Sequence, residues 1–232
     1  MTESLKELML DAALPHVAFD GWGTITFSAV CQELNLSESD AYAVCPRGAV
    51  DLAVAYHQRG DRLMRERIDA MDASGMRYSE RVAACVRFRI EAVDDKELVR
   101  RGMTLFAMPR NAGDAARLIW GTADQIWTAL GDTSDDINWY SKRAILSGVY
   151  TATVLFWLGD TTPGHSATWS FLDRRIQEVM QFEKAKSQAR KTPILNKLMG
   201  LQDALFSTVK APSSWPRSDL PGRNTRDTPP QS

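Results

Sequence analysis

The sequence contains few cysteines, and their arrangement argues against two common ways of stabilising a small fold. Of the 232 residues three are cysteines, Cys31, Cys45 and Cys85, and no two of them have the CxxC spacing. An odd number of cysteines without that spacing favours neither a disulfide framework nor a zinc site. We therefore expect a chain that folds on its hydrophobic core in a reducing compartment.

Long apolar runs are also absent. The most apolar stretch covers residues 144–158 and is bounded by Arg143 and Asp160. It is shorter than the roughly 20 residues that a helix needs to cross a bilayer, and so predicts a buried helix. The N-terminus has no charged segment followed by an apolar one, so no secretory signal is expected and a cytoplasmic location is predicted.

Motifs for catalysis or cofactor binding are missing as well. The three histidines, His16, His57 and His165, have no metal-ligand spacing, and none follows a glutamate by three residues, as the ExxH motif of di-iron bundles requires. No GxSxG, P-loop or GxGxxG string occurs. His57 and Asp61 share a helix face, which a solvated side-chain pair explains best. We expect no catalytic residue, no metal and no cofactor in a protein that is not an enzyme.

Charge is unevenly distributed along the chain. The net charge is −1, but residues 184–232 hold nine basic and three acidic side chains, which leaves 19 basic and 26 acidic ones before them. The first part thus carries −7 and the second +6. The first part is expected to repel polyanions, whereas the second is expected to attract an anionic surface.

Apolar residues recur at helical spacing through nearly the whole chain up to Lys210, and no stretch alternates for long enough to predict a strand. The predicted fold class is therefore all-α. The expected helices of the central part cover residues 98–108, 112–130, 138–158 and 166–181.

The N-terminal part has the outline of a helix-turn-helix. Short helices are predicted at residues 26–34 and 37–44, with a turn at Asn35 between them and a longer helix starting near Ala49. A repressor with a DNA-binding region and a helical ligand-binding body is therefore the alternative interpretation.

The charge of this part does not suit DNA. Residues 1–55 contain two basic and eight acidic side chains, whereas DNA affinity depends largely on Lys and Arg that neutralise phosphates. The predicted recognition helix at 37–44 carries Glu38 and Asp40 and has no Arg, Lys, Asn or Gln to pair with purine edges. We expect no nucleic-acid partner.

An amphipathic helix is predicted at residues 193–210, after a basic linker at 184–192 and before a disordered tail at 211–232. Its predicted membrane-contact side chains are Ile194, Leu195, Leu198, Met199, Leu201, Leu205, Phe206 and Val209. Burying a large aliphatic side chain is worth about 1.5–3 kcal/mol, so we expect peripheral binding to an anionic membrane. Docking on the same core, or exchange within a dimer, is the alternative.

A region in the second half of the chain resembles a known family. Residues 131–140 read Gly-Asp-Thr-Ser-Asp-Asp-Ile-Asn-Trp-Tyr and are followed by Lys-Arg-Ala at 142–144, within a similar run over residues 106–180. The stretch LPHVAFDGW at 14–22 is similar as well. Over about residues 5–185 the chain resembles the auxiliary proteins of ubiquinone biosynthesis, the ninth coenzyme Q protein family.

The resemblance implies a TetR-repressor-like fold that has lost DNA binding. Residues 1–48 would form the degenerate helix-turn-helix-like region, and residues 49–183 the lipid-binding and dimerisation body of a homodimer. It implies a non-catalytic protein, peripheral to the inner membrane, that binds an isoprenoid quinone intermediate or a phospholipid. The quinone would be presented to a demethoxyubiquinone hydroxylase.

The resemblance also implies a surface patch that docks this hydroxylase. Matched to this chain, the patch consists of Met108, Pro109, Trp127, Asp135, Asn138, Trp139, Tyr140 and Arg143. The alternative to a docking role is a structural one, in which each residue only caps a helix or fills the core. Because neighbours on a helix diverge by about 100°, Trp139, Tyr140 and Arg143 cannot all point inward, and at least one aromatic side chain is expected at the surface.

The residues that line the lipid pocket are not separable from core residues by sequence. The candidates are Leu118, Ile119, Ile126, Leu146, Val149, Val154, Phe156, Leu172 and Ile176. Each of them also fits a packed core. The helices at 138–158 and 166–181 also fit a dimer interface.

Overall fold

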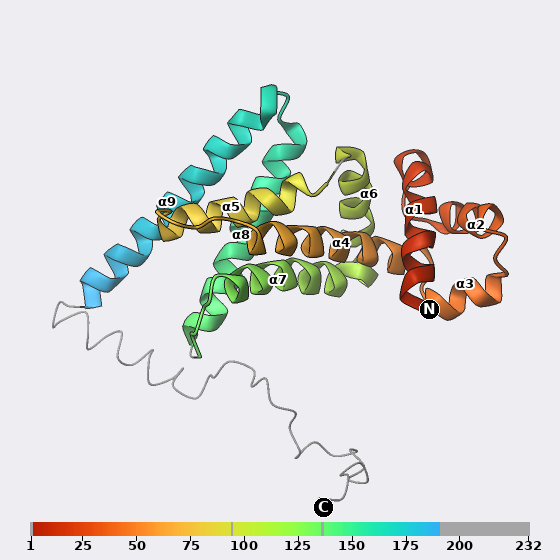
Figure 1. Cartoon of the computed structure of the whole chain (residues 1–232), viewed down its shortest axis with the longest axis horizontal. Coiled ribbons are helices and arrows are strands. Elements are labelled where there is room, and N and C mark those ends of the chain that lie inside the picture. The colour runs from red at the N-terminus through yellow and green to blue at the C-terminus, as the bar shows by residue number, and fades with distance from the viewer. Residues whose placement is uncertain (1, 94, 136, 191–232) are drawn as a thin grey trace, which may run out of the picture.

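The computed structural model describes residues 2–93, 95–135 and 137–190, and every regular element within these ranges is a helix (Figure 1). The all-α class predicted from the spacing of apolar residues is therefore confirmed. Within the same ranges, no helix is both long and apolar enough to span a membrane.

Three helices form the N-terminal region: α1 (Thr2–Asp20), α2 (Thr24–Glu33) and α3 (Glu38–Val44). The turn between α2 and α3 contains Asn35 with a φ of 52°, a left-handed conformation that asparagine adopts more readily than most residues. Ser37 then caps α3, because its side chain accepts a hydrogen bond of 3.1 Å from the backbone of the first turn. The turn and the two short helices lie where the sequence predicted them.

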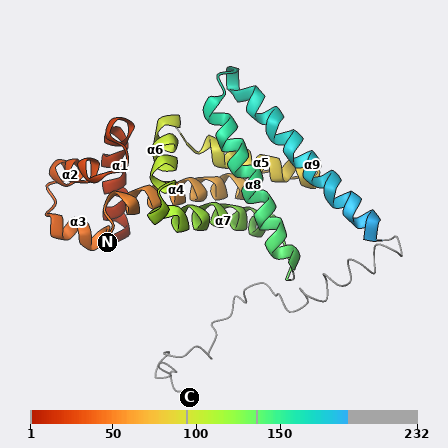
Figure 2. The ribbon, with the colours of Figure 1, turned by 180° about the vertical axis from the view of Figure 1, so that it is seen from behind.

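Six further helices follow in the described ranges. They are α4 (Ala49–Asp69), α5 (Tyr78–Glu91), α6 (Lys96–Phe106), α7 (Ala112–Ala129), α8 (Ile137–Gly159) and α9 (Ser166–Arg190). Short 3-10 helices at Pro109–Asn111 and Pro163–His165 lead into α7 and α9, because proline fits the first turn of a helix. Figures 1 and 2 show α4 running through the middle of the molecule beside α7, with α8 and α9 crossing it as a diagonal pair.

Helix α4 connects two hydrophobic cores. Its first half, with the buried Leu52, belongs to a core shared with α1, α2, α3 and α6. Its second half, with the buried Met64, belongs to a core shared with α5, α7, α8 and α9. Arg59 adds ion pairs across α1 and α4, at 2.6 Å to Glu7 and 2.7 Å to Asp11. The N-terminal region is thereby joined to the helical body rather than linked by a flexible hinge.

The boundary predicted at residue 48 coincides with Gly48, which has a φ of 58° and precedes α4. At the other end, α9 continues to Arg190, so residues 184–190, which the sequence assigned to a basic linker, are helical. The amphipathic helix predicted at 193–210, with its membrane-contact side chains, and the tail at 211–232 lie outside the described residues.

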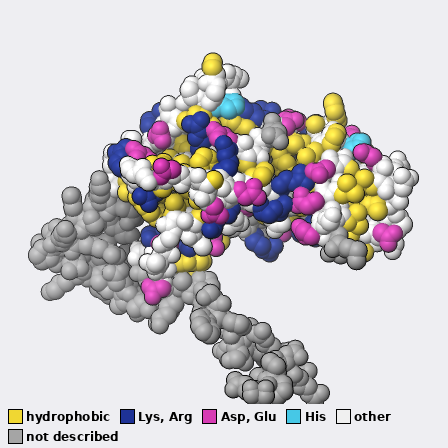
Figure 3. Space-filling view, viewed as in Figure 1, with side chains coloured by type: hydrophobic (Ala, Val, Ile, Leu, Met, Phe, Trp, Pro, Cys, Tyr) yellow, Lys and Arg dark blue, Asp and Glu magenta, His cyan; other side chains and the backbone are white. Residues whose placement is uncertain are grey.

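The surface of the molecule is mixed in charge. On the face seen in Figure 3, dark blue basic side chains gather over the central part, around α4 and α5, whereas hydrophobic and acidic side chains dominate over the α1–α3 region. This distribution agrees with the deficit of Lys and Arg in the N-terminal 55 residues.

Candidate functional site

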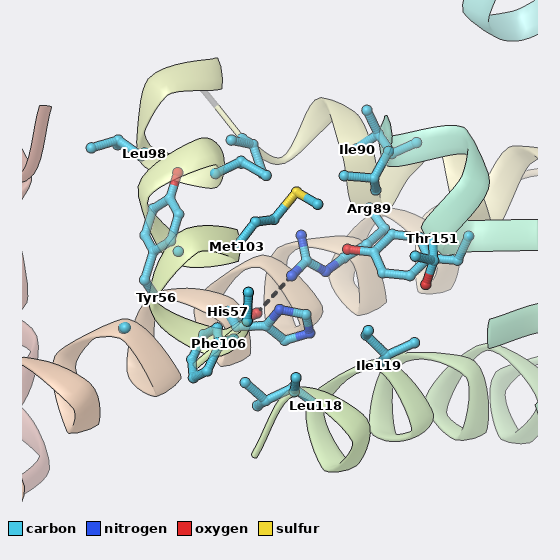
Figure 4. Close-up of a pocket in the computed structure, with 18 of the residues that line it drawn as sticks. Tyr56, His57, Arg89, Ile90, Leu98, Met103, Phe106, Leu118, Ile119 and Thr151 are labelled. Carbon is cyan, nitrogen blue, oxygen red and sulfur yellow. Dashed lines mark hydrogen bonds between the residues drawn. The ribbon is translucent and has the colours of Figure 1, made fainter. Parts of the chain in front are cut away.

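A cavity of about 270 Å³ lies where α4, α5, α6, α7 and α8 meet. Figure 4 shows its walls converging from these helices. Most lining side chains are apolar: Ile90, Val93, Leu98, Val99, Met103, Phe106, Leu118, Ile119, Val154 and Trp157. Concave, mostly apolar spaces with a few polar groups are typical ligand sites, and their volumes usually begin near about 300 Å³. This cavity is therefore slightly smaller than the usual range for a drug-sized ligand.

A buried polar network lies at one side of the cavity. The residues Arg89 and Asp61 are both 3% exposed, and Arg89 Nε donates a hydrogen bond of 2.6 Å to Asp61 Oδ1. Thr122 Oγ1 donates to the same carboxylate oxygen at 2.8 Å and lies 2.9 Å from His57 Nε2. Arg89 Nη2 donates to the carbonyl oxygen of His57 at 3.0 Å, the bond drawn as a dashed line in Figure 4. The network connects α4, α5 and α7.

The sequence of α4 makes room for this network. His57, Gly60 and Asp61 lie three and four residues apart and so share one face of the helix. A Cβ atom on Gly60 would lie 2.5 Å from Arg89 Nη1 and 2.7 Å from Arg89 Cζ. Glycine inside a helix costs about 0.5–1 kcal/mol relative to alanine, and here it lets the guanidinium lie directly on the α4 backbone.

The network is electrically balanced near neutral pH. Burial, and after it the charge of Arg89, lower the pKa of His57 to about 3, so His57 is neutral. Burial raises the pKa of Asp61, while the charge and hydrogen bond of Arg89 act in the opposite direction. A buried carboxylate and a buried guanidinium in hydrogen-bond contact retain their charges as a pair. The sequence analysis expected His57 and Asp61 to form a solvated pair on the surface. This was wrong, because both belong to a buried network with Arg89 and Thr122.

A second cluster surrounds the start of α8. Trp139 contacts Tyr140 and Trp120 with ring centroids 4.8 Å and 5.9 Å apart. The guanidinium of Arg143 lies over the Trp139 ring, 3.9 Å from its centroid. Aromatic and cation–π pairs each add about 0.5–1.5 kcal/mol of stabilisation beyond that from burying the rings.

Arg143 is fixed by carboxylates beneath this cluster. Its Nε donates to Asp124 Oδ1 at 2.5 Å, and its Nη1 donates to Asp132 Oδ2 at 3.0 Å. Lys142 Nζ binds Asp132 Oδ1 at 2.6 Å. Although burial opposes ionisation, hydrogen bonds from Lys142, Ser134 and Arg143 lower the pKa of Asp132 to about 2. The motif at residues 131–143 therefore builds an ion-pair network that fixes the start of α8.

Comparisons with known proteins agree with the family resemblance that the motif at residues 131–143 indicated. A sequence model of the COQ9 family matches residues 112–183. The probable ubiquinone biosynthesis protein coq9, mitochondrial, of Dictyostelium discoideum is 29% identical over 197 residues, which cover 81% of this chain and 64% of that protein. The human ubiquinone biosynthesis protein COQ9, mitochondrial, is 27% identical over 207 residues, 85% of this chain and 65% of that protein.

The chain is thus similar to proteins of the COQ9 family over most of its length. It spans slightly less than two thirds of the length of these curated relatives, 64% and 65%. Among solved structures, a TetR transcriptional regulator from Nitrosomonas europaea superimposes with a TM-score of 0.61 at 17% identity, covering 75% of this chain and 97% of that one. The TetR-like fold predicted from the sequence is therefore confirmed.

The lipid-pocket candidates separate into three groups in the structure. Leu118, Ile119 and Val154 line the cavity. Phe156 is 39% exposed and stacks on Phe171 outside it, with ring centroids 4.6 Å apart. The remaining candidates lie in the second hydrophobic core rather than on the cavity wall: Ile126, Leu146, Val149, Leu172 and Ile176. These five residues pack among α4, α5, α7, α8 and α9, and their contact with a lipid stays a prediction.

The candidate hydroxylase patch is also divided. Met108, which is 41% exposed, and Pro109 lie at the junction of α6 and α7. Trp127, Asp135, Asn138, Trp139 and Tyr140 lie around the opposite end of α7 and the start of α8. Trp139 and Tyr140 are half-buried, and Arg143 is only 2% exposed. The buried position of Arg143, held by Asp124 and Asp132, agrees with the structural alternative for this residue, and the docking patch stays a prediction.

Several site residues escaped the sequence analysis. Arg89, His57, Met103 and Phe106 line the cavity, and Trp120 belongs to the aromatic cluster. One signal was available for Arg89: it lies within the apolar stripe Val82, Val86, Ile90 and Val93. A charged residue on a buried helix face requires a partner, and that partner could not be identified from the sequence of α5 alone.

Proposed function

We propose that this chain is a non-catalytic accessory protein of ubiquinone biosynthesis that binds an isoprenoid quinone intermediate and presents it to a hydroxylase. The observation that carries the proposal is the apolar cavity of about 270 Å³ between α4 and α8 in a chain similar to COQ9 proteins. The curated relatives are named ubiquinone biosynthesis proteins, which indicates the pathway in which such a ligand would occur.

The chemistry of the cavity supports a binding role over a catalytic one. A general base works best when its pKa lies near the operating pH. His57, the histidine of the lining, has a pKa of about 3 and is hydrogen-bonded within the Thr122–Asp61–Arg89 network. It is therefore suited to hold a ligand in place and not to move protons at neutral pH.

The place of action is the surface of the inner membrane. The curated relatives are named mitochondrial. In support of a peripheral position, the sequence from residue 184 onward carries a charge of +6 and an amphipathic pattern at 193–210, and basic residues near an anionic surface contribute up to about 1 kcal/mol each. A homodimer, with α8 and α9 at its interface, is part of the same proposal.

A ligand-responsive DNA-binding regulator is the second candidate, since the chain shares its fold with a TetR regulator. The chemistry of α3 argues against it. Glu38 and Asp40 occupy its first turn, and they repel the phosphates that a recognition helix must approach. The accessory role is therefore the function we favour.

A reconstituted assay tests the proposal. Vesicles containing a polyprenyl quinone precursor are mixed with a purified demethoxyubiquinone hydroxylase, and hydroxylation is followed with and without this chain. We expect the chain to raise the rate and the variant Ile119→Trp, which fills the cavity, to lose most of that effect. Leu63→Trp is the matched control, because Leu63 lies on the exposed side of α4. Equal stimulation by both variants would contradict a role for the cavity.

A further inference from the structure

The residues that line the cavity differ in exposure. Arg89, Ile90, Leu118 and Tyr150 are nearly inaccessible to solvent, as are Trp22, Ala53, Leu98 and Trp157, whereas Ala107 is exposed. The polar network belongs to the inaccessible part of the lining, and Figure 4 shows the guanidinium of Arg89 reaching between Met103 and His57 into the space that the apolar walls surround. An amphiphile bound here would meet hydrogen-bond donors at Arg89, and the lining reaches solvent at Ala107.

We propose that Arg89 binds the oxygen of a neutral ring head group, a quinone or a phenol that enters the cavity first, while the apolar chain leaves beside Ala107. This inference rests on the proposed function and assigns the orientation and head-group chemistry of its ligand. It makes Arg89 a specificity-determining residue rather than only a structural one.

The donors of Arg89 support this assignment. A guanidinium has five N–H donors and no acceptor. Among the described residues, its hydrogen bonds run from Nε to Asp61 and from Nη2 to the carbonyl oxygen of His57. Further N–H groups remain on a side chain that lines the cavity. A carbonyl or hydroxyl oxygen of a ligand ring is the acceptor that they fit.

The charge balance selects a neutral head group. Asp61 compensates Arg89 at 2.6 Å, and His57 has a pKa of about 3 and adds no charge. A carboxylate head group would bring an additional negative charge next to Asp61 in a region of low dielectric constant, which is costly. A fatty acid is therefore a poorer ligand than a quinone of the same chain length.

The volume limits how much of a ligand the cavity can hold. About 270 Å³ holds one ring with a short length of chain, since drug-sized ligands need about 300–1,000 Å³. The remainder of a long polyprenyl chain must lie outside. Its exit next to Ala107 is adjacent in sequence to Met108 and Pro109, the exposed residues at the junction of α6 and α7.

The experiment compares two probes that differ only in ring oxygens. 2-Hexyl-1,4-benzoquinone and hexylbenzene are each used to displace a fluorescent apolar dye from the purified full-length chain. A hydrogen bond to a charged donor in a closed site favours the quinone by about tenfold or more in half-displacing concentration. Hexanoate, the charged probe, is expected to displace the dye less well than the quinone.

Two variants separate recognition from folding. Arg89→Met/Asp61→Asn removes both charges and so leaves no buried ion unpaired, and Gly60→Ala keeps both charges but displaces the guanidinium. We expect both to bind hexylbenzene as the wild type does and to lose the preference for the quinone. If the circular dichroism spectrum of the double variant differs from that of the wild type, the probe preference is compared between the wild type and Gly60→Ala alone.

The outcomes are distinguishable. Equal displacement by quinone and hexylbenzene in the wild type, or a preference that survives in the variants, overturns the role of Arg89 while leaving apolar ligand binding intact. Failure of both probes to displace the dye would overturn the cavity as a ligand site, and with it the proposed function.

Discussion

At the scale of single residues, one glycine and one arginine determine the shape of the cavity. Arg89 is buried against α4, and its guanidinium lies where a side chain at residue 60 would begin, because a Cβ atom there would be 2.5 Å from Arg89 Nη1. The ion pair with Asp61 and the bond to the His57 carbonyl depend on this close approach. Gly60 therefore stabilises the fold despite its low helix propensity.

We expect Gly60→Ala to lower the free energy of unfolding by about 1–3 kcal/mol, because a buried ion pair is displaced. Helix propensity alone predicts the opposite sign, a gain of up to about 1 kcal/mol. Urea denaturation measures the difference. The control is Gly121→Ala on α7, where nothing lies within 4 Å of an added Cβ atom; a loss of stability equal to that of Gly60→Ala would contradict the explanation.

The pKa of His57 predicts a pH-dependent stability. The folded state holds it at about 3, whereas a histidine in an unfolded chain titrates near about 6.5. Below a pH of about 6.5 the unfolded state therefore binds a proton that the folded state excludes, and stability falls as pH drops toward 3, by at most about 1.4 kcal/mol per pH unit. Unfolding by urea at pH 7, 6 and 5 should show this slope.

The matched variants for this prediction are His57→Gln and His16→Gln. His57→Gln should flatten the slope between pH 7 and 5, and the surface variant His16→Gln should retain it. The same slope in all three proteins would show that His57 is not the group responsible.

At the scale of elements, the helices were more predictable than the surfaces they form. The sequence placed one helix at 138–158 and the structure has α8 at Ile137–Gly159, because turn-forming residues at its two ends are visible locally. Whether an apolar residue such as Ile126 or Ile119 faces a core or a cavity depends on helices distant in sequence. The sequence therefore predicted the elements, whereas three of its nine pocket candidates, Leu118, Ile119 and Val154, line the cavity.

The hydroxylase patch shows the same limit. The motif at residues 131–143 was recognised as a unit, yet Arg143 serves to anchor α8 through Asp124 and Asp132. Trp139 and Tyr140 remain half-buried above it, together with Trp120 from α7. Since α8 packs along α7, the aromatic side chains of the two helices form one cluster, which is the part of the predicted patch most suited to contact a partner.

We expect Trp139→Gln to weaken binding of the demethoxyubiquinone hydroxylase about 30-fold, the effect of a typical interface hot spot. Glutamine is chosen because a lysine would place a second cation beside Arg143. Binding is measured by surface plasmon resonance and folding by circular dichroism. Phe19→Gln, which removes an exposed aromatic side chain from α1, should bind as the wild type; unchanged binding by Trp139→Gln would remove this cluster from the interface.

At the scale of the whole molecule, the fold of a DNA-binding repressor is combined with surface chemistry that does not suit DNA. The N-terminal 55 residues carry two basic and eight acidic side chains, while the body retains a mostly apolar cavity with a neutral polar network. The sequence predicted both features: the unsuitable charge follows from counting side chains, whereas the repressor-like fold was implied by the resemblance to a known family. It did not predict the cavity's polar side, which requires α4, α5 and α7 to meet.

The most direct test of the account is mass spectrometry of the lipids that copurify with the detergent-free protein, compared with a total lipid extract of the same cells. We expect a polyprenyl quinone or phenol to be enriched with the wild type and with Leu63→Trp, and to be lost with Ile119→Trp. Bulk phospholipid alone, or equal amounts of quinone in both variants, would contradict the claim that the cavity binds a quinone intermediate.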